Sequence, residues 1–167
     1  MHETTISTPD DFEGWLVLAR EVEPLFGPMV EDRNFREGLW QAIVDGHALC
    51  VRAETGENEQ RLHGGIVIAP EANEILWFAV AMESRGKGLG KTLLHAAIKN
   101  LDKTRPIIVT TFDQTVAAGT PARNLYHAAG FRESSPAGMN PAGIPTVTML
   151  LIKPQGGTLT CDGRPTC

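Results

Sequence analysis

The chain has 167 residues, of which 42% are hydrophobic and 21% are charged, a composition typical of one globular domain and not of a disordered or fibrous protein. Its 20 acidic and 15 basic side chains leave a net charge of −5, which disfavours nucleic acid as a partner. No apolar run approaches the roughly 18 residues that a membrane span needs, and no basic-then-apolar leader opens the chain, so we expect a cytoplasmic protein without membrane contact.

Two helices are expected in the first third of the chain. The sequence TPDD, residues 8–11, is typical of a capped helix start with proline in the first turn. Apolar residues then recur at helical spacing, and we expect this helix to end before Pro24. A second helical pattern covers 35–44, where Gly46 is placed to end it. The segment EPLFGPMVEDR, 23–33, is expected to form an apolar loop between the helices.

Three short runs with high strand propensity come next. Turn-forming sequences separate them, TGENE before the second run and PEAN before the third. The runs cover 47–52, 61–69 and 74–81. This spacing predicts three strands in meander order.

The second half of the chain predicts a helix, a strand, a helix and a last strand. Leucines and alanines over 89–101 form one apolar helical face. The run at 107–112 is typical of a strand buried on both faces, and we expect it to pair parallel to the third strand in a right-handed βαβ unit. A short helix is expected from Thr120 until Gly130 ends it, and the last strand covers 145–153.

We therefore expect one domain over 1–153 and a flexible tail over 154–167, which is rich in glycine, proline and threonine. Cys161 and Cys167 lie in that tail, and their spacing matches no metal-ligand pattern. Cys50 lies in an apolar stretch and is expected to be a small buried hydrophobic residue.

The glycine-rich stretch ESRGKGLGKTLL, 83–94, follows an apolar strand and opens a helix, where successive backbone amides bind anions. A nucleotide P-loop would need glycine where the chain has Arg85. The dinucleotide pattern GxGxxG also fails, because its two frames place Lys91 and Leu93 at the last glycine. The pattern that remains is RxxGxG over 85–90, whose glycines let the backbone wrap closely around a pyrophosphate.

This turn resembles the signature with which the GNAT acyltransferase family binds the pyrophosphate of acetyl-CoA. The family also carries an alanine, a tyrosine and a terminal Gly-Phe in the helix after the next strand, and this chain has Ala122, Tyr126 and Gly130-Phe131 there. The order of elements over 1–153 is similar as well. The resemblance implies an α/β (α+β) fold with a central mixed, mostly antiparallel sheet of six or seven strands, one parallel splayed pair and about four flanking helices.

The resemblance further implies an N-acetyltransferase that moves an acetyl group from acetyl-CoA to an amine acceptor by direct attack in a ternary complex. It makes Tyr126 the acid that serves the departing thiolate. Glu74 resembles the base of the histone-acetylating branch of the family, and a solvent-facing carboxylate at a strand start is the other interpretation. Glu23, Glu31 and Asp32 compete with it for contact with a cationic amine.

The same resemblance assigns the coenzyme contacts. Backbone groups of one strand would pair with the pantetheine arm, and the glycine-rich turn would hold the phosphates. These residues are Phe78, Ala79, Val80, Arg85, Gly86, Lys87, Gly88, Leu89, Gly90 and Lys91. Two positions depart from the family, since Gly119 stands where an asparagine often helps to hold the cofactor and Met82 where proline often precedes the turn. A CoA-binding sensor or interaction module without turnover therefore stays open as the alternative.

The acceptor pocket is expected between the segments 23–33 and 134–145, whose Phe26, Met29 and Met139 predict partly apolar walls. A small-molecule amine and a peptide amine both fit this expectation. Whether the protein forms a homodimer stays open.

No metal is implied by the sequence. His63, His95 and His127 are scattered and have no partners at metal-ligand spacing, so packing or surface roles are expected for them.

Overall fold

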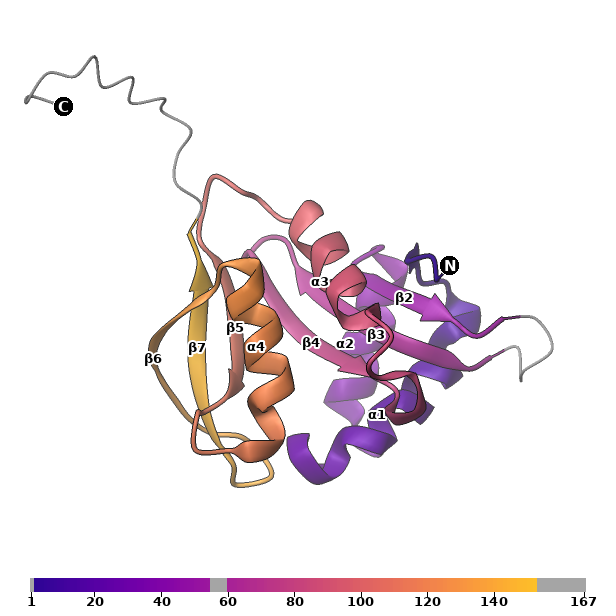
Figure 1. The fold of residues 1–167 in the computed structure, drawn as a ribbon. Coiled ribbons are helices and arrows are strands. Elements are labelled where there is room, and N and C mark those ends of the chain that lie inside the picture. Colours follow the sequence, from indigo (N-terminus) through magenta and orange to yellow (C-terminus); the bar gives the residue numbers. More distant parts are fainter. Residues whose placement is uncertain (1, 55–59, 153–167) are drawn as a thin grey trace, which may run out of the picture.

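The computed structural model describes residues 2–54 and 60–152, which build one mixed sheet with helices on both faces (Figure 1). The strands are β1 (Thr5–Ile6), β2 (Ala48–Arg52), β3 (Leu62–Ala69), β4 (Glu74–Val80), β5 (Ile107–Phe112), β6 (Arg132–Met139) and β7 (Pro145–Leu151). The helices are α1 (Phe12–Phe26), α2 (Arg33–Val44), α3 (Leu89–Lys99) and α4 (Thr120–Ala129). The predicted turn TGENE at 55–59, the tail at 154–167 and its two cysteines lie outside the described residues.

The sheet has the order β1-β2-β3-β4-β5-β7-β6, and within it β4 and β5 are the parallel pair. The expected fold class is thereby confirmed, including the number of strands and the splayed parallel pair. The predicted meander is confirmed too, because β2, β3 and β4 pair antiparallel in chain order. None of the helices in the described ranges is long and apolar enough to cross a membrane.

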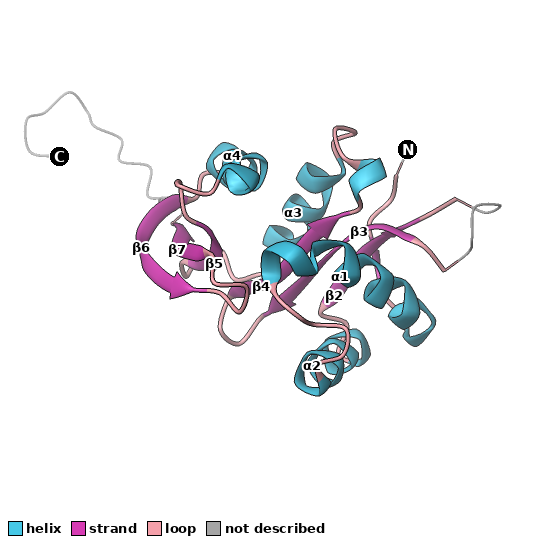
Figure 2. Ribbon diagram, turned by 90° about the horizontal axis from the view of Figure 1, so that it is seen from below, coloured by secondary structure: helices cyan, strands magenta, loops and turns pink. Residues whose placement is uncertain are grey.

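Two layers of helices enclose the sheet (Figure 2). Helices α1 and α2 cover one face over a core that contains Trp15 and the expected buried thiol of Cys50, both 0% exposed. Helices α3 and α4 cover the other face over a second core that contains Leu93, Phe131 and Met149. The sheet therefore separates two hydrophobic cores, and any passage between them must run through the sheet itself.

Helix α1 is longer than predicted, and the expectation that it ends before Pro24 was wrong. Pro24 lies in the last turn, where a missing N–H removes only one hydrogen bond of the helix. Gly27, with φ 96°, ends the helix instead, and its N–H donates to the Glu23 carbonyl at 2.8 Å. The loop predicted over 23–33 is consequently only the part after Phe26.

The parallel pairing of β4 and β5 is very short. Only Glu74 with Ile108 and Ile75 with Val109 are in register, after which the two strands separate. The register between β3 and β4 shifts at the same level and leaves Leu76 as an extra residue. Because a bulge bends a strand and increases its twist, this one turns the rest of β4 away from β5.

Asn73 determines where the parallel pair begins. Its side chain is 1% exposed, and its Nδ2 donates to the carbonyls of Asp102 at 2.8 Å and Pro106 at 3.0 Å. Its Oδ1 accepts the N–H of Asp102 at 2.8 Å, and its carbonyl accepts the N–H of Ile108 at 3.0 Å. Asn73 also has φ 55°, a conformation that asparagine tolerates better than most residues. The turn before β4 is thus tied to the loop before β5.

Strand β6 was not predicted from the residues, which gave no element between the helix that Gly130 ends and the last strand at 145–153. Every residue of β6 is exposed, so no apolar alternation marks it. It is an edge strand paired only with β7, and an edge strand tolerates Pro136 and the two register shifts seen there. The segment 134–145 is therefore the second half of β6 and the turn that joins it to β7.

Candidate functional site

The glycine-rich turn forms an open concavity of backbone N–H groups at the start of α3. Gly86 and Gly88 have φ 76° and 80°, and an added Cβ at either would meet no atom within 4 Å. Within the described part of the chain, none of the amides from Gly86 to Lys91 donates a hydrogen bond. Free amides and the positive end of a helix dipole together favour an anion, as the sequence predicted.

The side chains around this turn differ in their contacts and exposure. Arg85 folds back, and its Nε donates to the Val80 carbonyl at 3.1 Å. Lys87 and Lys91 are exposed beside the free amides. Leu89 is only 3% exposed and anchors the turn in the core, so it can offer an anion only its backbone N–H.

Gly90 is needed for a different reason from Gly86 and Gly88. An added Cβ would come within 3.1 Å of Leu125 and 3.5 Å of Phe78. The small residue therefore lets α3 approach both α4 and β4. The close packing of α3 on β4 places the glycine-rich turn beside the C-terminal end of β4, where β4 and β5 have separated.

Strand β4 presents hydrogen-bonding groups to that gap. The N–H of Ala81 donates to the His63 carbonyl on β3 at 2.8 Å. Since backbone groups alternate in direction along an antiparallel strand, those of Ala79 also point toward β3, while those of Phe78 and Val80 point toward β5. With β5 splayed away, Phe78 and Val80 offer an unpaired strand edge to a ligand.

Tyr126 lies on α4 at the bottom of the gap. Its ring packs against Phe78 at 6.2 Å and Phe131 at 5.5 Å between centroids, and the residue is 4% exposed. No hydrogen bond to its hydroxyl is present among the described residues, and Tyr126 lines the cavity described below. Burial raises the pKa of Tyr126 well above its ordinary value, so the hydroxyl keeps its proton.

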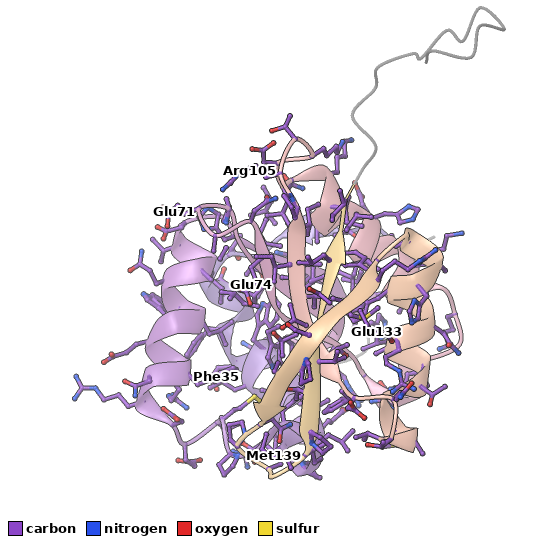
Figure 3. All side chains as sticks on the ribbon, turned by 90° about the vertical axis from the view of Figure 1, so that its left-hand side faces the viewer. Phe35, Glu71, Glu74, Arg105, Glu133 and Met139 are labelled. Carbon is purple, nitrogen blue, oxygen red and sulfur yellow. The ribbon has the colours of Figure 1, made fainter. Side chains whose placement is uncertain are left out.

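Glu74 lies on the other side of the sheet from Tyr126. Figure 3 shows it between strand β5 and helix α2, which carries Phe35. The side chain is half-buried, and this burial raises its pKa above the ordinary 4.5. Glu74 does not line the main cavity, but its neighbour Ile75 does.

The competing carboxylates are engaged elsewhere to different degrees. Glu23 accepts the N–H groups of Met29 and Val30 at 3.1 and 2.8 Å, which lowers its pKa and organises the loop after α1. Asp32 lines the cavity, and its Oδ1 caps α2. Glu31 is exposed and faces Arg20 at 3.6 Å. Only Asp32 is therefore placed to meet an acceptor from this group.

A cavity of about 400 Å³ passes through the sheet where β4 and β5 separate. It reaches from Tyr126 and Ala122 on α4 to the C-terminal end of α1 and the start of α2. Its walls are Phe26, Pro28, Met29, Asp32, Phe35, Ile75, Leu76, Trp77, Phe78, Val109, Thr110, Thr111, Phe112, Ala122, Tyr126, Asn140, Pro141 and Thr146. This size lies within the usual range of small-molecule sites, about 300–1,000 Å³.

The expected acceptor walls are present only in part. Phe26 and Met29 line the cavity as predicted, whereas Met139 is 69% exposed and does not. Sequence reasoning missed Trp77 and Phe112, which lie on strands that it had identified correctly. The alternation of side chains along 74–81 was the available signal for Trp77, since it places that residue opposite Phe78.

Gly119, one of the two departures from the family pattern, is explained by the fold. A Cβ at Gly119 would lie 2.5 Å from the Cβ of Phe112, so no larger residue fits there without movement. Phe112 stacks on Phe26 with centroids 5.4 Å apart. The glycine thus makes room for an aromatic wall of the cavity.

The histidines take part in packing. His63 is 8% exposed, and its Nδ1 lies 2.7 Å from the Oγ of the buried Ser84, just before the glycine-rich turn. His127 lies 3.2 Å from Glu133. In the described residues no three side chains of metal-ligating type lie together.

Comparisons with known proteins agree on one family. A family model described as an acetyltransferase (GNAT) domain matches residues 21–153. No curated protein matches the chain significantly. Among solved structures, a GNAT-family acetyltransferase from Bacillus cereus superposes with TM-score 0.67 at 15% identity, covering 93% of this chain and 99% of that one.

Two further structures are similar to the chain. The ribosomal-protein-alanine N-acetyltransferase of Brucella melitensis has TM-score 0.67 and 20% identity, with 90% of this chain and 99% of that one covered. NAA60 of Arabidopsis thaliana, solved in complex with acetyl-CoA, has TM-score 0.65 and 16% identity, with 90% and 97% covered. At these identities the structures show a shared fold.

Proposed function

The chain belongs to the GNAT family of acetyltransferases, and from this premise we propose that it transfers the acetyl group of acetyl-CoA to a primary amine by direct attack in a ternary complex. The observation that carries the proposal is the row of free amides from Gly86 to Lys91 beside the open edge of β4. A diphosphate and an extended arm are the two parts of coenzyme A that such a pair of features fits.

Acetyl-CoA would lie with its diphosphate on the turn and its pantetheine arm along β4. The backbone groups of Phe78 and Val80 would face this arm, and the exposed Lys87 and Lys91, with Arg85 beside them, would add positive charge near the phosphates. The Val80 carbonyl already accepts from Arg85, but a carbonyl has two lone pairs and can take a second donor. The acetyl-CoA complex of the Arabidopsis structure supports the choice of ligand.

The reaction joins the amine nitrogen to the thioester carbonyl carbon and breaks the carbon–sulfur bond. An amine is mostly an ammonium at neutral pH, so a base must first accept one proton. Glu74 is our candidate, because its raised pKa makes it a stronger base than an exposed glutamate. Its proton would travel through water, since the side chain does not line the cavity.

The departing thiolate needs a hydrogen-bond donor, and Tyr126 is suited to that role. Its pKa is raised by burial, so it stays protonated and stabilises the sulfur by a hydrogen bond from its hydroxyl. The second proton, which the nitrogen loses as the amide forms, is taken up by the thiolate, so that CoA leaves as the thiol. The N–H of Phe78 or Val80 would meanwhile hold the carbonyl oxygen as negative charge develops on it.

Two measurements test this function. Acetyl-CoA at a hundred times its dissociation constant should stabilise the protein by about 2.7 kcal/mol, and ATP at the same concentration should not. Release of CoA thiol should then depend on an added amine. Stabilisation without thiol release would support the sensor alternative, and no stabilisation by acetyl-CoA or CoA would overturn the coenzyme site.

A further inference from the structure

We propose that the acceptor is a small aromatic amine with one positive charge, and not a polypeptide or a polyamine. This inference rests on the proposed acetyl transfer and concerns the part of the cavity on the side of α1 and α2. Three observations carry it: the aromatic walls, the number of charged groups among them, and a contact that bars one side.

Four aromatic side chains line this side of the cavity: Phe26, Phe35, Trp77 and Phe112. Trp77 lies at their centre, with its ring 6.2 Å from Phe26 and 6.4 Å from Phe35 between centroids, at interplanar angles of 55° and 57°. Phe26 stacks on Phe112 with an interplanar angle of 11°. Aromatic pairs add roughly 0.5–1.5 kcal/mol beyond the burial of their area, so a flat ring is the body that these walls bind best.

The charge of the walls matches one cation. Asp32 is the single ionisable acid or base among the lining residues other than Tyr126, and Glu74 is not among them. Part of the Asp32 carboxylate is already used to accept the N–H groups of Asn34 and Phe35. A polyamine would bring several ammonium groups into an apolar space without enough partners, which is costly.

A contact between the C-terminal end of α1 and the turn between β6 and β7 closes one side of the cavity. A bound polypeptide would have to extend out of the cavity on this side. The Nδ2 of Asn140, in the turn between β6 and β7, donates to the Leu25 carbonyl of α1 at 2.7 Å. Next to it, Pro141 approaches Gly27 so closely that a Cβ on the glycine would lie 2.7 Å away. The end of α1 and the hairpin turn therefore touch and leave no trough for an extended chain.

The acceptor class is tested by kcat/KM for CoA thiol release with four acceptors: 2-phenylethylamine, hexylamine, spermidine and a ten-residue peptide with a free N-terminus. We expect 2-phenylethylamine to exceed spermidine and the peptide at least tenfold and to exceed hexylamine by a smaller factor. A preference below tenfold over spermidine or the peptide, or none over hexylamine, overturns the proposal but leaves acetyl transfer standing. If none of the four acceptors causes release of CoA thiol, both the acceptor class and the proposed acetyl transfer are overturned.

A pair of variants tests the walls directly. Phe35→Ala removes a ring of the cavity and should raise the KM for 2-phenylethylamine roughly tenfold, because the substrate ring loses apolar surface to pack against. Phe12→Ala is the matched control, because Phe12 packs against Trp40 outside the cavity, at 5.4 Å between centroids. The Kd for acetyl-CoA should change in neither variant. Equal KM values for the two variants would overturn the proposal.

The contact between the end of α1 and the β6–β7 turn is tested by Asn140→Asp. The aspartate keeps an oxygen that accepts the N–H groups of Ala142 and Ile144, and it replaces the Nδ2 donor to Leu25 with a second carboxylate oxygen. Spermidine controls for the added negative charge at this position of the cavity wall. Activity on the peptide relative to 2-phenylethylamine should rise at least threefold, while spermidine should gain no more than 2-phenylethylamine does. An unchanged peptide ratio, or equal gains for peptide and spermidine, would show that the contact does not exclude polypeptides.

Discussion

Replacing Gly88 by alanine separates the phosphate-binding role of the turn from its contribution to stability. Gly88 has φ 80°, and an added Cβ meets nothing within 4 Å, so the variant suffers backbone strain and no clash. A non-glycine residue in this region costs roughly 1–2 kcal/mol. At about 2–4 °C per kcal/mol for a chain of this size, Tm should fall by about 2–8 °C.

The same substitution should affect coenzyme binding far more. The new methyl group stands in the open space of the turn, and the strain favours backbone angles that turn the amides away from a common point. We expect the Kd for acetyl-CoA, measured by titration calorimetry, to rise at least tenfold, which is about 1.4 kcal/mol. Gly138→Ala is the control, because Gly138 has φ 81° and equally open surroundings but lies on β6.

Both variants should lose similar stability, and only Gly88→Ala should lose affinity. If Gly88→Ala binds acetyl-CoA as tightly as Gly138→Ala does, the amides of this turn do not hold the diphosphate. The coenzyme account would then fail at its first step. A matched loss of affinity in both variants would point to destabilisation as the cause, and would refute the reasoning equally.

Three further predictions concern single side chains. Tyr126→Phe should lower kcat by roughly 10²-fold or more at an unchanged Kd for acetyl-CoA, and calorimetric Tm should hardly change because Tyr126 lines the cavity and its hydroxyl makes no hydrogen bond to the described residues. Since burial raises the pKa of Glu74 above 4.5, kcat/KM should fall as the pH drops through that raised pKa, and a pH profile of Glu74→Gln should lack this limb. Asn73→Ala removes donors to Asp102 and Pro106 and leaves the Asp102 N–H unpaired, so urea unfolding should show a loss of about 3 kcal/mol.

Each of these has an outcome that contradicts it. Full turnover in Tyr126→Phe removes the tyrosine from the chemistry. If the fall of kcat/KM at low pH is still present in Glu74→Gln, another group is the base. The control variant is Glu133→Gln, which changes an exposed glutamate of β6. A loss below 1 kcal/mol in Asn73→Ala would mean that water replaces the lost bonds.

The coenzyme side of the site could be predicted from the sequence because its information is local. Gly86 and Gly88 adopt positive φ, and the helix start that follows them is encoded within a few residues. The same holds for α4, which begins at Thr120 and is ended by Gly130 with φ 104°. Short-range backbone preferences determine these features, so a single sequence is sufficient to predict them.

The acceptor side could not be predicted in the same way. Its aromatic walls come from α1, α2, β4 and β5, and they meet only because the strands diverge after Ile75. The length of α1 past Pro24 and the pairing of the exposed strand β6 depend on tertiary contacts that no local pattern announces. The role of Gly119 was likewise visible only once Phe112 was seen against it.

The two-residue ladder between β4 and β5 also has a mechanical consequence. Few backbone bonds hold the half of the sheet that carries β1 to β4 to the half that carries β5 to β7, and this ladder is shorter than those on either side of it, β3–β4 and β5–β7. Acetyl-CoA bound along the open edge of β4 would fill the gap between the two halves as an added strand does, and would reduce their relative motion. Amide deuterium uptake at Phe78 and Val80 should therefore slow markedly once the donor is present, and the enzyme would be most compliant between turnovers.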